Sequence, residues 1–295
     1  MIECGVPYLT GDLSTRSKNH RNHYSLRTPI KCTEPRLAIL WGRFTRSRTF
    51  VPNDFPLFSA GSHFTDDTVL TAAIEEAILR WDAGDGELET LAVEELLHFF
   101  NAHPDAAYGA RFIEWARGPE QKPYGSFGNG SAMRISGAGF YARTIEEAQQ
   151  LAERVTAVTH NHPDGIRGAA AVSSAIFLAK TGTPKDEIRR YIDSNFYPVM
   201  FHLASIPKDY GFEAACSRSV PQALVAFFES DGFEDAIRNA ISIGGDSDTI
   251  AAIAGSVAEA AYGVPELIRS EVDRRLTPDL RDVFVSFQKR LQSRK

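Results

Sequence analysis

Apolar residues spaced three and four apart constrain the fold of this chain most strongly. In "TDDTVLTAAIEEAILRW" one face of a predicted helix carries Leu70, Ala73, Ile74, Ala77, Ile78 and Trp81. "TIEEAQQLAERVTAVTHNHP" repeats the pattern behind a capping box, Thr144 and Glu147, and is expected to stop before Pro163. Further helices are predicted over "GIRGAAAVSSAIFLAKTG", "TPKDEIRRYI" (N-cap Thr183), "SVPQALVAFFES", "GFEDAIRNAIS" and "DTIAAIAGSVAEAAYG". Long alternating runs typical of strands are absent from the sequence, so we predict an all-α fold, a single compact multi-helix domain.

The first 48 residues differ from the rest of the chain. "RSKNHRNHYSLRTPIKCTEPR" is basic and polar and has neither a helical nor a strand period. We therefore predict a loosely ordered N-terminal segment over 1–48 and a helical domain over 49–295.

Composition narrows the classes of protein. A formal net charge of −6 disfavours general nucleic-acid binding, which normally needs a basic surplus. No apolar run is long enough to span a bilayer, and the N-terminus lacks the apolar core of a leader. The three scattered cysteines suit a reducing compartment better than a disulfide framework. We expect a cytoplasmic protein without a membrane partner, of open oligomeric state.

Two acidic clusters precede predicted helices, "HFTDDTVL" and "GGDSDTIAA". A helix N-terminus stabilises an anion by about 0.3–1 kcal/mol, whereas burying several carboxylates together costs several kcal/mol. A divalent cation would resolve this conflict, and carboxylate and Thr oxygens suit Mg²⁺ or Mn²⁺. The alternative is N-capping, because Asp and Thr are common caps. An EF-hand and a P-loop are both excluded by the absence of their motifs.

Two further stretches carry candidate binding residues. The glycine-rich "YGSFGNGSAMRI" could bring backbone N–H groups close to a pyrophosphate, although such a loop alone is a weak signal. In "THNHPDG", His160 and His162 form an HxH pair. That pair could belong to a zinc site, but no third ligand is indicated, and it also suits the C-terminal end of a helix. Cys216 is interpreted as a small core residue and Arg134 as a structural ion-pair partner.

Together these motifs resemble a known family. "FTDDTVLT", "GSFGNGSAMRIS", "THNHPDGIRGA", "SVPQALVAF" and "AISIGGDSDTIAAIAG" occur in an order similar to that of the ADP-ribosylglycohydrolase family, over roughly residues 49 to 265. That family includes bacterial enzymes that remove ADP-ribose from dinitrogenase reductase. The resemblance implies an all-helical domain with a metal-containing cleft, two Mg²⁺ or Mn²⁺ ions, and ADP-ribose or an ADP-ribosylated protein as substrate.

The resemblance also implies roles for particular residues. The expected metal ligands are Thr65, Asp66, Asp67, Asp246, Asp248 and Thr249. The expected ligand-binding residues are Gly128, Asn129, Gly130, Ser131, Met133, His160, Asn161 and Gly165. Either Asp66 or Asp67 would act as the general base in hydrolysis of the glycosidic bond.

The N-terminal stretch departs from the family pattern. Family members carry an early Gly-Asp pair and a downstream Glu that approaches the metals, whereas "LAILWGRFTRSRTF" contains neither acid. This departure motivates an alternative, an ADP-ribose-binding protein with the same fold and weak or lost catalysis.

Overall fold

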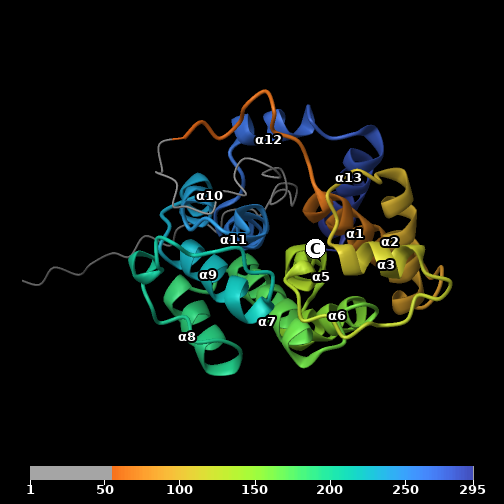
Figure 1. The fold of residues 1–295 in the computed structure, drawn as a ribbon, viewed down its shortest axis with the longest axis horizontal. Coiled ribbons are helices and arrows are strands. Elements are labelled where there is room, and N and C mark those ends of the chain that lie inside the picture. Colours follow the sequence, from red (N-terminus) through yellow and green to blue (C-terminus); the bar gives the residue numbers. More distant parts are fainter. Residues whose placement is uncertain (1–54, 295) are drawn as a thin grey trace, which may run out of the picture. The chain divides into compact units, whose positions relative to one another are not determined.

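The computed structural model describes residues 55–294 (Figure 1). This part of the chain contains thirteen α-helices and one 3₁₀ turn, without a β-strand, which confirms the all-α prediction. The helices are α1 (Asp66–Ala83), α2 (Leu88–Ala102), α3 (Ala110–Arg117), α4 (Gly130–Met133), α5 (Ser136–Tyr141), α6 (Ile145–Ala157), α7 (Pro163–Lys180), α8 (Lys185–Asn195), α9 (Cys216–Phe228), α10 (Phe233–Ser242), α11 (Ser247–Tyr262), α12 (Glu266–Asp273) and α13 (Pro278–Ser293), with the 3₁₀ turn η1 at Leu203–Ser205. The predicted segment 1–48 and its boundary lie outside the described residues.

Helix α1 forms as its periodicity predicts. The predicted apolar face is buried, except for Trp81 at its end, which is partly buried. The helix ends at Gly84, whose φ of 89° is the left-handed conformation that glycine adopts without a Cβ penalty. The buried face packs against α2 and α13.

Helix α11 is buried along almost its whole length. Its sequence is alanine-rich, and small side chains such as Ala251, Ala254 and Ala258 allow neighbouring helices to approach closely. It packs against α10, α9 and α7, as Figure 1 shows. A helix that is apolar on all sides belongs inside a bundle, so α11 holds its N-terminus in a fixed position.

The short helix α4 lies in contact with four longer helices. It contacts α1 and α11, and it also packs against α7 and α9. Helices α1 and α11 contact each other as well. The glycine-rich stretch directly before α4 is therefore held next to the N-termini of the two helices that carry the acidic clusters.

Two predicted helix ends differ from the structure. Helix α6 ends at Ala157, and His162 is the N-cap of α7, where its Nδ1 accepts from the Asp164 N–H at 3.1 Å. The expectation that the histidine pair closes a helix is therefore wrong. Thr183 does not cap α8, whose N-cap is Pro184, because the Thr183 N–H closes the end of α7 on the Leu178 carbonyl at 3.0 Å.

The predicted capping box at the start of α6 is confirmed. Thr144 Oγ1 accepts from the Glu147 N–H at 3.1 Å, and the Glu147 carboxylate accepts from the Arg143 N–H at 2.6 Å. No helix in the described part is long and apolar enough to cross a lipid bilayer.

Candidate functional site

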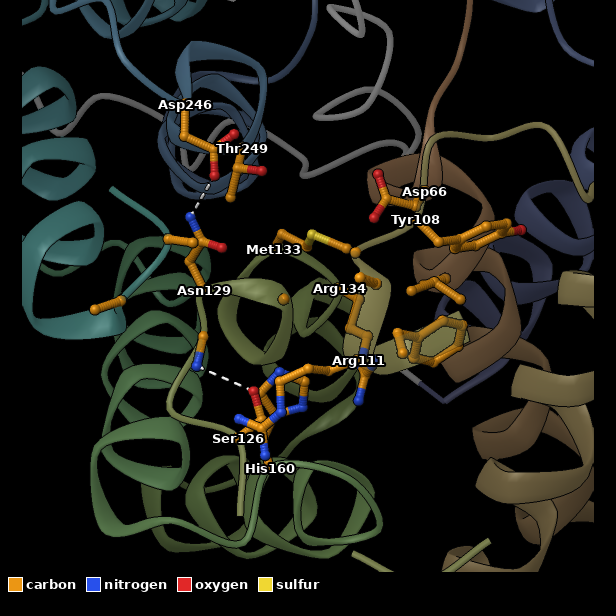
Figure 2. Close-up of a pocket in the computed structure, with 18 of the residues that line it drawn as sticks. Asp66, Tyr108, Arg111, Ser126, Asn129, Met133, Arg134, His160, Asp246 and Thr249 are labelled. Carbon is orange, nitrogen blue, oxygen red and sulfur yellow. Dashed lines mark hydrogen bonds between the residues drawn. The ribbon is translucent and has the colours of Figure 1, made fainter. Parts of the chain in front are cut away.

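A cavity of about 810 Å³ lies between the starts of α1 and α11, the glycine-rich stretch and the chain segments around α3 and before α9 (Figure 2). Nine of the residues predicted for the site line it: Asp66, Gly128, Asn129, Gly130, Met133, His160, Asp246, Asp248 and Thr249. Their side chains come from stretches that are distant in sequence. The structure therefore brings both acidic clusters and the predicted ligand-binding loop to one place.

The two acidic clusters are close enough to influence each other electrostatically. Asp67 is buried, and burial is the largest cause that raises its pKa well above the ordinary value. The negative charges of Asp248, Asp66 and Asp246 raise it further, in that order, while the Thr65 hydroxyl opposes the shift. The charges of four carboxylates thus act on one another where the two helices begin, and without a counter-ion they oppose one another.

Helix capping does not account for these acids. Thr65 occupies the N-cap of α1, but its side chain accepts no backbone N–H; its Oγ1 donates to Asp67 Oδ2 at 2.9 Å. Asp246 occupies the N-cap of α11 and likewise makes no side-chain cap. Its Oδ2 instead accepts from Asn129 Nδ2 at 2.7 Å, the bond drawn in Figure 2. The N-capping alternative is wrong for both residues.

The donor set fits an oxygen-preferring cation. Asp67 Oδ1 and Asp248 Oδ1 are buried and have no hydrogen-bond partner in the part of the chain that the structure describes, which is costly for a carboxylate unless something else compensates its charge. The hydroxyls of Thr65 and Thr249 add hard oxygen donors of the kind that Mg²⁺ binds. Within residues 55–294, however, no three Asp, Glu, His or Cys side chains already form a metal-binding group. Binding of a cation would therefore require these side chains to reorient.

The glycine-rich stretch is anchored at its back. Asn129 N–H donates to the Ala214 carbonyl at 2.6 Å, and Cys216 N–H donates to the Phe127 carbonyl at 3.0 Å. On its inner side, a Cβ at Gly130 would lie 3.4 Å from His160 Nε2, and a Cβ at Gly128 would lie 3.7 Å from it. The imidazole of His160 therefore packs against the bare backbone of the loop, and both line the cavity.

Three predicted ligand-binding residues do not line the cavity and instead hold this loop. Ser131 Oγ donates to the Gly165 carbonyl at 2.9 Å, and Asn161 Oδ1 accepts from the Gly125 N–H at 2.7 Å. At Gly165 a Cβ would lie 2.7 Å from the Ser126 carbonyl oxygen, so this position needs glycine for close packing. Direct contact of these three residues with a ligand stays a prediction.

The histidine pair does not form a zinc site. His162 is exposed and caps α7, whereas His160 is buried against the glycine-rich stretch and lines the cavity. Burial lowers the pKa of His160 well below its ordinary value, and the nearby positive charges of Arg134 and Arg111 lower it further. The neutral imidazole of His160 therefore belongs to the cavity wall.

Two interpretations outside the acidic clusters have different outcomes. Cys216 is fully buried and burial raises the pKa of its thiol to about 12, which confirms a packing residue rather than a nucleophile. Arg134 is also fully buried, but it forms no ion pair with any described residue, so the ion-pair interpretation is wrong.

The sequence analysis missed several residues that line the cavity. Tyr108 and Arg111 lie beside the start of α3, and Phe212 and Glu213 lie in the segment before α9. None of them belongs to a motif or to a periodic pattern. Arg111 Nη2 also donates to the carbonyl of Tyr124, another residue that lines the cavity. The Arg111 guanidinium lies 5.0 Å from the centre of the Tyr124 ring.

Gly245→Ala is expected to destabilise the protein by about 1–3 kcal/mol. Gly245 has a φ of 66°, and an added Cβ would lie 2.6 Å from the Gly211 carbonyl oxygen. The turn that carries Asp246 would have to move, so ligand affinity should fall too. Gly86→Ala is the control, because it is exposed and its Cβ would make only ordinary contact at 3.7 Å with Leu91. Thermal unfolding that is equal for both variants would contradict this account.

Comparisons with known proteins identify relatives of this chain. Mouse ADP-ribosylhydrolase ARH3 is 24% identical over 269 residues, which cover 70% of this chain and 72% of that protein. ADP-ribosylarginine hydrolase Tri1 of Pseudomonas putida is 30% identical over 145 residues, covering 46% of this chain and 39% of the relative. An uncharacterized protein of Archaeoglobus fulgidus is 27% identical over 248 residues, covering 74% and 78%.

A solved structure described as an ADP-ribosylglycohydrolase-related protein complex shares the fold, with a TM-score of 0.59 at 19% identity over 85% of this chain and 89% of that chain. The family model for ADP-ribosylglycohydrolase matches residues 27–293 and so begins inside the segment 1–48 that the sequence analysis sets apart. Because that model spans most of the sequence, the chain belongs to the ADP-ribosylglycohydrolase family.

Proposed function

We propose that this protein hydrolyses the glycosidic bond between ADP-ribose and an acceptor, such as an ADP-ribosylated protein. The observation that carries the proposal is the shared cavity, in which Asp66, Asp246 and Asp248 face the glycine-rich stretch. A nucleotide diphosphate could lie along the bare backbone of that stretch, with the ribose to be cleaved directed towards the carboxylates. Membership of the family supplies the class of bond.

Asp66 is the better placed of the two candidate bases. Its carboxylate lines the cavity and is partly exposed, whereas Asp67 is buried behind it. In the proposed reaction a water oxygen bonds to the anomeric carbon, the bond from that carbon to the acceptor breaks, and the acceptor leaves with a proton. Asp66 would accept a proton from the attacking water and return it, directly or through solvent, to the leaving acceptor. Asn129 would hold Asp246 in place through their hydrogen bond.

Two divalent cations, Mg²⁺ or Mn²⁺, are part of the proposal. The residues that would hold them are Thr65, Asp66, Asp67, Asp246, Asp248 and Thr249, of which Asp67 and Asp248 contribute the buried oxygens without partners. When bound, such ions orient ribose hydroxyls and lower the pKa of water. Their positive charge would also relieve the repulsion among the four carboxylates.

The binding-only alternative depends on residues 1–48, which lie outside the described residues. No observation on the described part favours it. The proposal leaves the chemical identity of the acceptor general, since the name of the Pseudomonas putida relative specifies ADP-ribosylarginine whereas that of the mouse relative specifies no linkage.

The test is release of free ADP-ribose from an ADP-ribosylated protein by the full-length chain. We expect release in Mg²⁺ or Mn²⁺, and loss of about two orders of magnitude or more in EDTA, restored by added metal. Calorimetry with ADP-ribose should run in parallel. Tight binding without release in either metal would favour the binding-only alternative, and the absence of both binding and release would exclude the proposed function.

A further inference from the structure

A buried chain of polar side chains runs behind the glycine-rich stretch. Arg134 Nη2 donates to Thr159 Oγ1 at 2.7 Å, and Thr159 Oγ1 lies 2.7 Å from His160 Nδ1. The exposed fractions are 1% for Arg134, 0% for Thr159 and 4% for His160. Bulk water therefore cannot substitute for these contacts, and each donor needs its acceptor within the chain.

The directions of these hydrogen bonds follow from their chemistry. A guanidinium has donors only, so Thr159 Oγ1 must accept from Arg134. The single hydroxyl proton of Thr159 can go to His160 Nδ1 at 2.7 Å or to the Thr156 carbonyl at 3.4 Å. The Thr156 carbonyl already accepts from the N–H groups of Thr159 at 3.1 Å and His160 at 2.8 Å, so both of its lone pairs are used and the hydroxyl proton goes to Nδ1. His160 Nδ1 then accepts. A neutral imidazole that accepts at Nδ1 carries its proton on Nε2.

The proton on Nε2 points at the cavity. Nε2 lies 3.4 Å from the point where a side chain at Gly130 would begin and 3.7 Å from that point at Gly128. His160 lines the cavity, and no described group is recorded as accepting from its Nε2. The ring is neutral because burial and the adjacent guanidinium groups of Arg134 and Arg111 both oppose a second proton and hold its pKa low.

The charge of Arg134 is the second observation. Among residues 55–294, its buried Nη1 has no hydrogen-bond partner and no ion pair with the guanidinium is recorded. The negative charge of Asp66 acts on Arg134 without forming an ion pair with it, and burying a cation without a close partner costs several kcal/mol. Arg134 borders the cavity beside Met133 and Asp66 (Figure 2), so a ligand that brings negative charge into the cavity would compensate it.

We propose that Arg134 and Thr159 are positioning residues that fix His160 as its Nε2–H tautomer, so that it donates to a phosphate oxygen of a diphosphate ligand on the glycine-rich stretch. The identity of that ligand rests on the proposed function, whereas the tautomer does not. Arg134 would act in two ways. It directs the Thr159 hydroxyl towards His160 Nδ1, and it places a positive charge beside the cavity that would hold the diphosphate.

Two matched substitutions at Thr159 test the tautomer in the full-length protein. Thr159→Val keeps the shape and loses the hydroxyl, whereas Thr159→Ser keeps the hydroxyl. The readout is the ¹⁵N NMR signal of the His160 ring nitrogens, assigned by its disappearance in His160→Gln. We expect the Nε2–H form in the parent and in Thr159→Ser, and a mixture of tautomers in Thr159→Val. An Nδ1–H form in the parent, or an unchanged tautomer in Thr159→Val, would overturn the proposal.

Calorimetry with ADP-ribose tests the consequence. We expect Thr159→Val to bind about tenfold more weakly and Thr159→Ser to stay within about threefold of the parent. If Thr159→Val does not fold, the substitutions His160→Gln and His160→Asn decide which ring nitrogen donates to the ligand. Gln can place an amide N–H where Nε2–H lies and should stay within about threefold, whereas Asn places it near Nδ1 and should lose about tenfold. The reverse order would contradict the donor role.

The two proposals fail differently. If the parent does not bind ADP-ribose at all, the proposed function fails, and the NMR comparison of Thr159→Val with Thr159→Ser still decides whether the tautomer is fixed. If ADP-ribose binds but Thr159→Val has parental affinity and a parental tautomer, the proposed function stands and the positioning role is excluded.

Discussion

Asp67→Asn is expected to remove hydrolysis of an ADP-ribose conjugate and, in the same protein, to raise the melting temperature measured without metal. The loss in kcat/KM should reach about a thousandfold, equivalent to about 4 kcal/mol, because a two-metal site would lose a charged ligand. Substitution of a residue that stabilises the fold has a different result, because it lowers both the melting temperature and the activity.

The expected gain in stability follows from the surroundings of Asp67. The residue is 3% exposed, feels the charges of Asp248, Asp66 and Asp246, and has one carboxylate oxygen without a hydrogen-bond partner within residues 55–294. The neutral amide of Asn ends the repulsion, and its oxygen can still accept from Thr65 Oγ1. Removing one of four opposing charges should stabilise the metal-free protein by about 1–3 kcal/mol.

The measurement is thermal unfolding in EDTA and in Mg²⁺, alongside the release assay. Mg²⁺ should raise the melting temperature of the parent and leave that of Asp67→Asn almost unchanged, because a ligand stabilises only the state that binds it. Asp282→Asn, an exposed position on α13 away from the cavity, serves as the control. Parental turnover in Asp67→Asn would exclude this ligand role, and a lower melting temperature in EDTA would make the carboxylate structural.

The sequence could predict elements that local patterns determine. The apolar spacing of α1 and the capping box of α6 decide their conformations within a few residues, and both are confirmed. The C-terminal end of α6 could not be predicted from such a local pattern. Helical periodicity continues through "THNHP", and only the hydrogen bond from Asp164 N–H to His162 Nδ1 shows that His162 already starts α7.

The site was predictable where chemistry alone marks a residue. Paired acids directly before helices with a buried face are costly wherever they are themselves buried, so the sequence indicated Asp66 and Asp246 as candidates while leaving N-capping as the alternative. Tyr108 and Phe212 could not be found this way, because tertiary packing alone places their segments at the cavity. Arg134 illustrates a different gap: its residue type suggested an ion pair, and only the structure shows a hydroxyl as its recorded side-chain partner.

A second carboxylate pair between α1 and α11 should make stability fall with rising pH. Glu75 and Glu259 are 2% and 3% exposed, and Glu75 Oε2 has no hydrogen-bond partner among the described residues. Burial is the largest cause that raises the pKa of Glu75 well above its ordinary value, and the charge of Glu259 raises it further, while the Ser136 hydroxyl opposes the shift. The folded protein therefore holds a proton on Glu75 that the unfolded chain releases near pH 4.3.

The sign of the effect follows from where the proton is bound. Between about pH 4.3 and the raised pKa of Glu75, the folded state carries one more proton than the unfolded state, so each rise in pH favours unfolding. The slope is at most about 1.4 kcal/mol per pH unit. Glu75→Gln removes this penalty, because a neutral amide resembles the protonated acid in shape and does not titrate.

We therefore expect Glu75→Gln to match the parent near pH 4.3 and to exceed its free energy of unfolding by a margin that widens with pH until the raised pKa is passed. Denaturant unfolding at several pH values measures this margin, with Glu153→Gln on the exposed face of α6 as the control. The Glu75 side chain cannot move towards Gly137 to relieve the repulsion, since it already packs so closely there that a Cβ at Gly137 would lie 2.8 Å from Glu75 Cγ. Parallel pH curves for parent and variant would mean that the carboxyl of Glu75 ionises freely in the folded state, which its burial between two helices argues against.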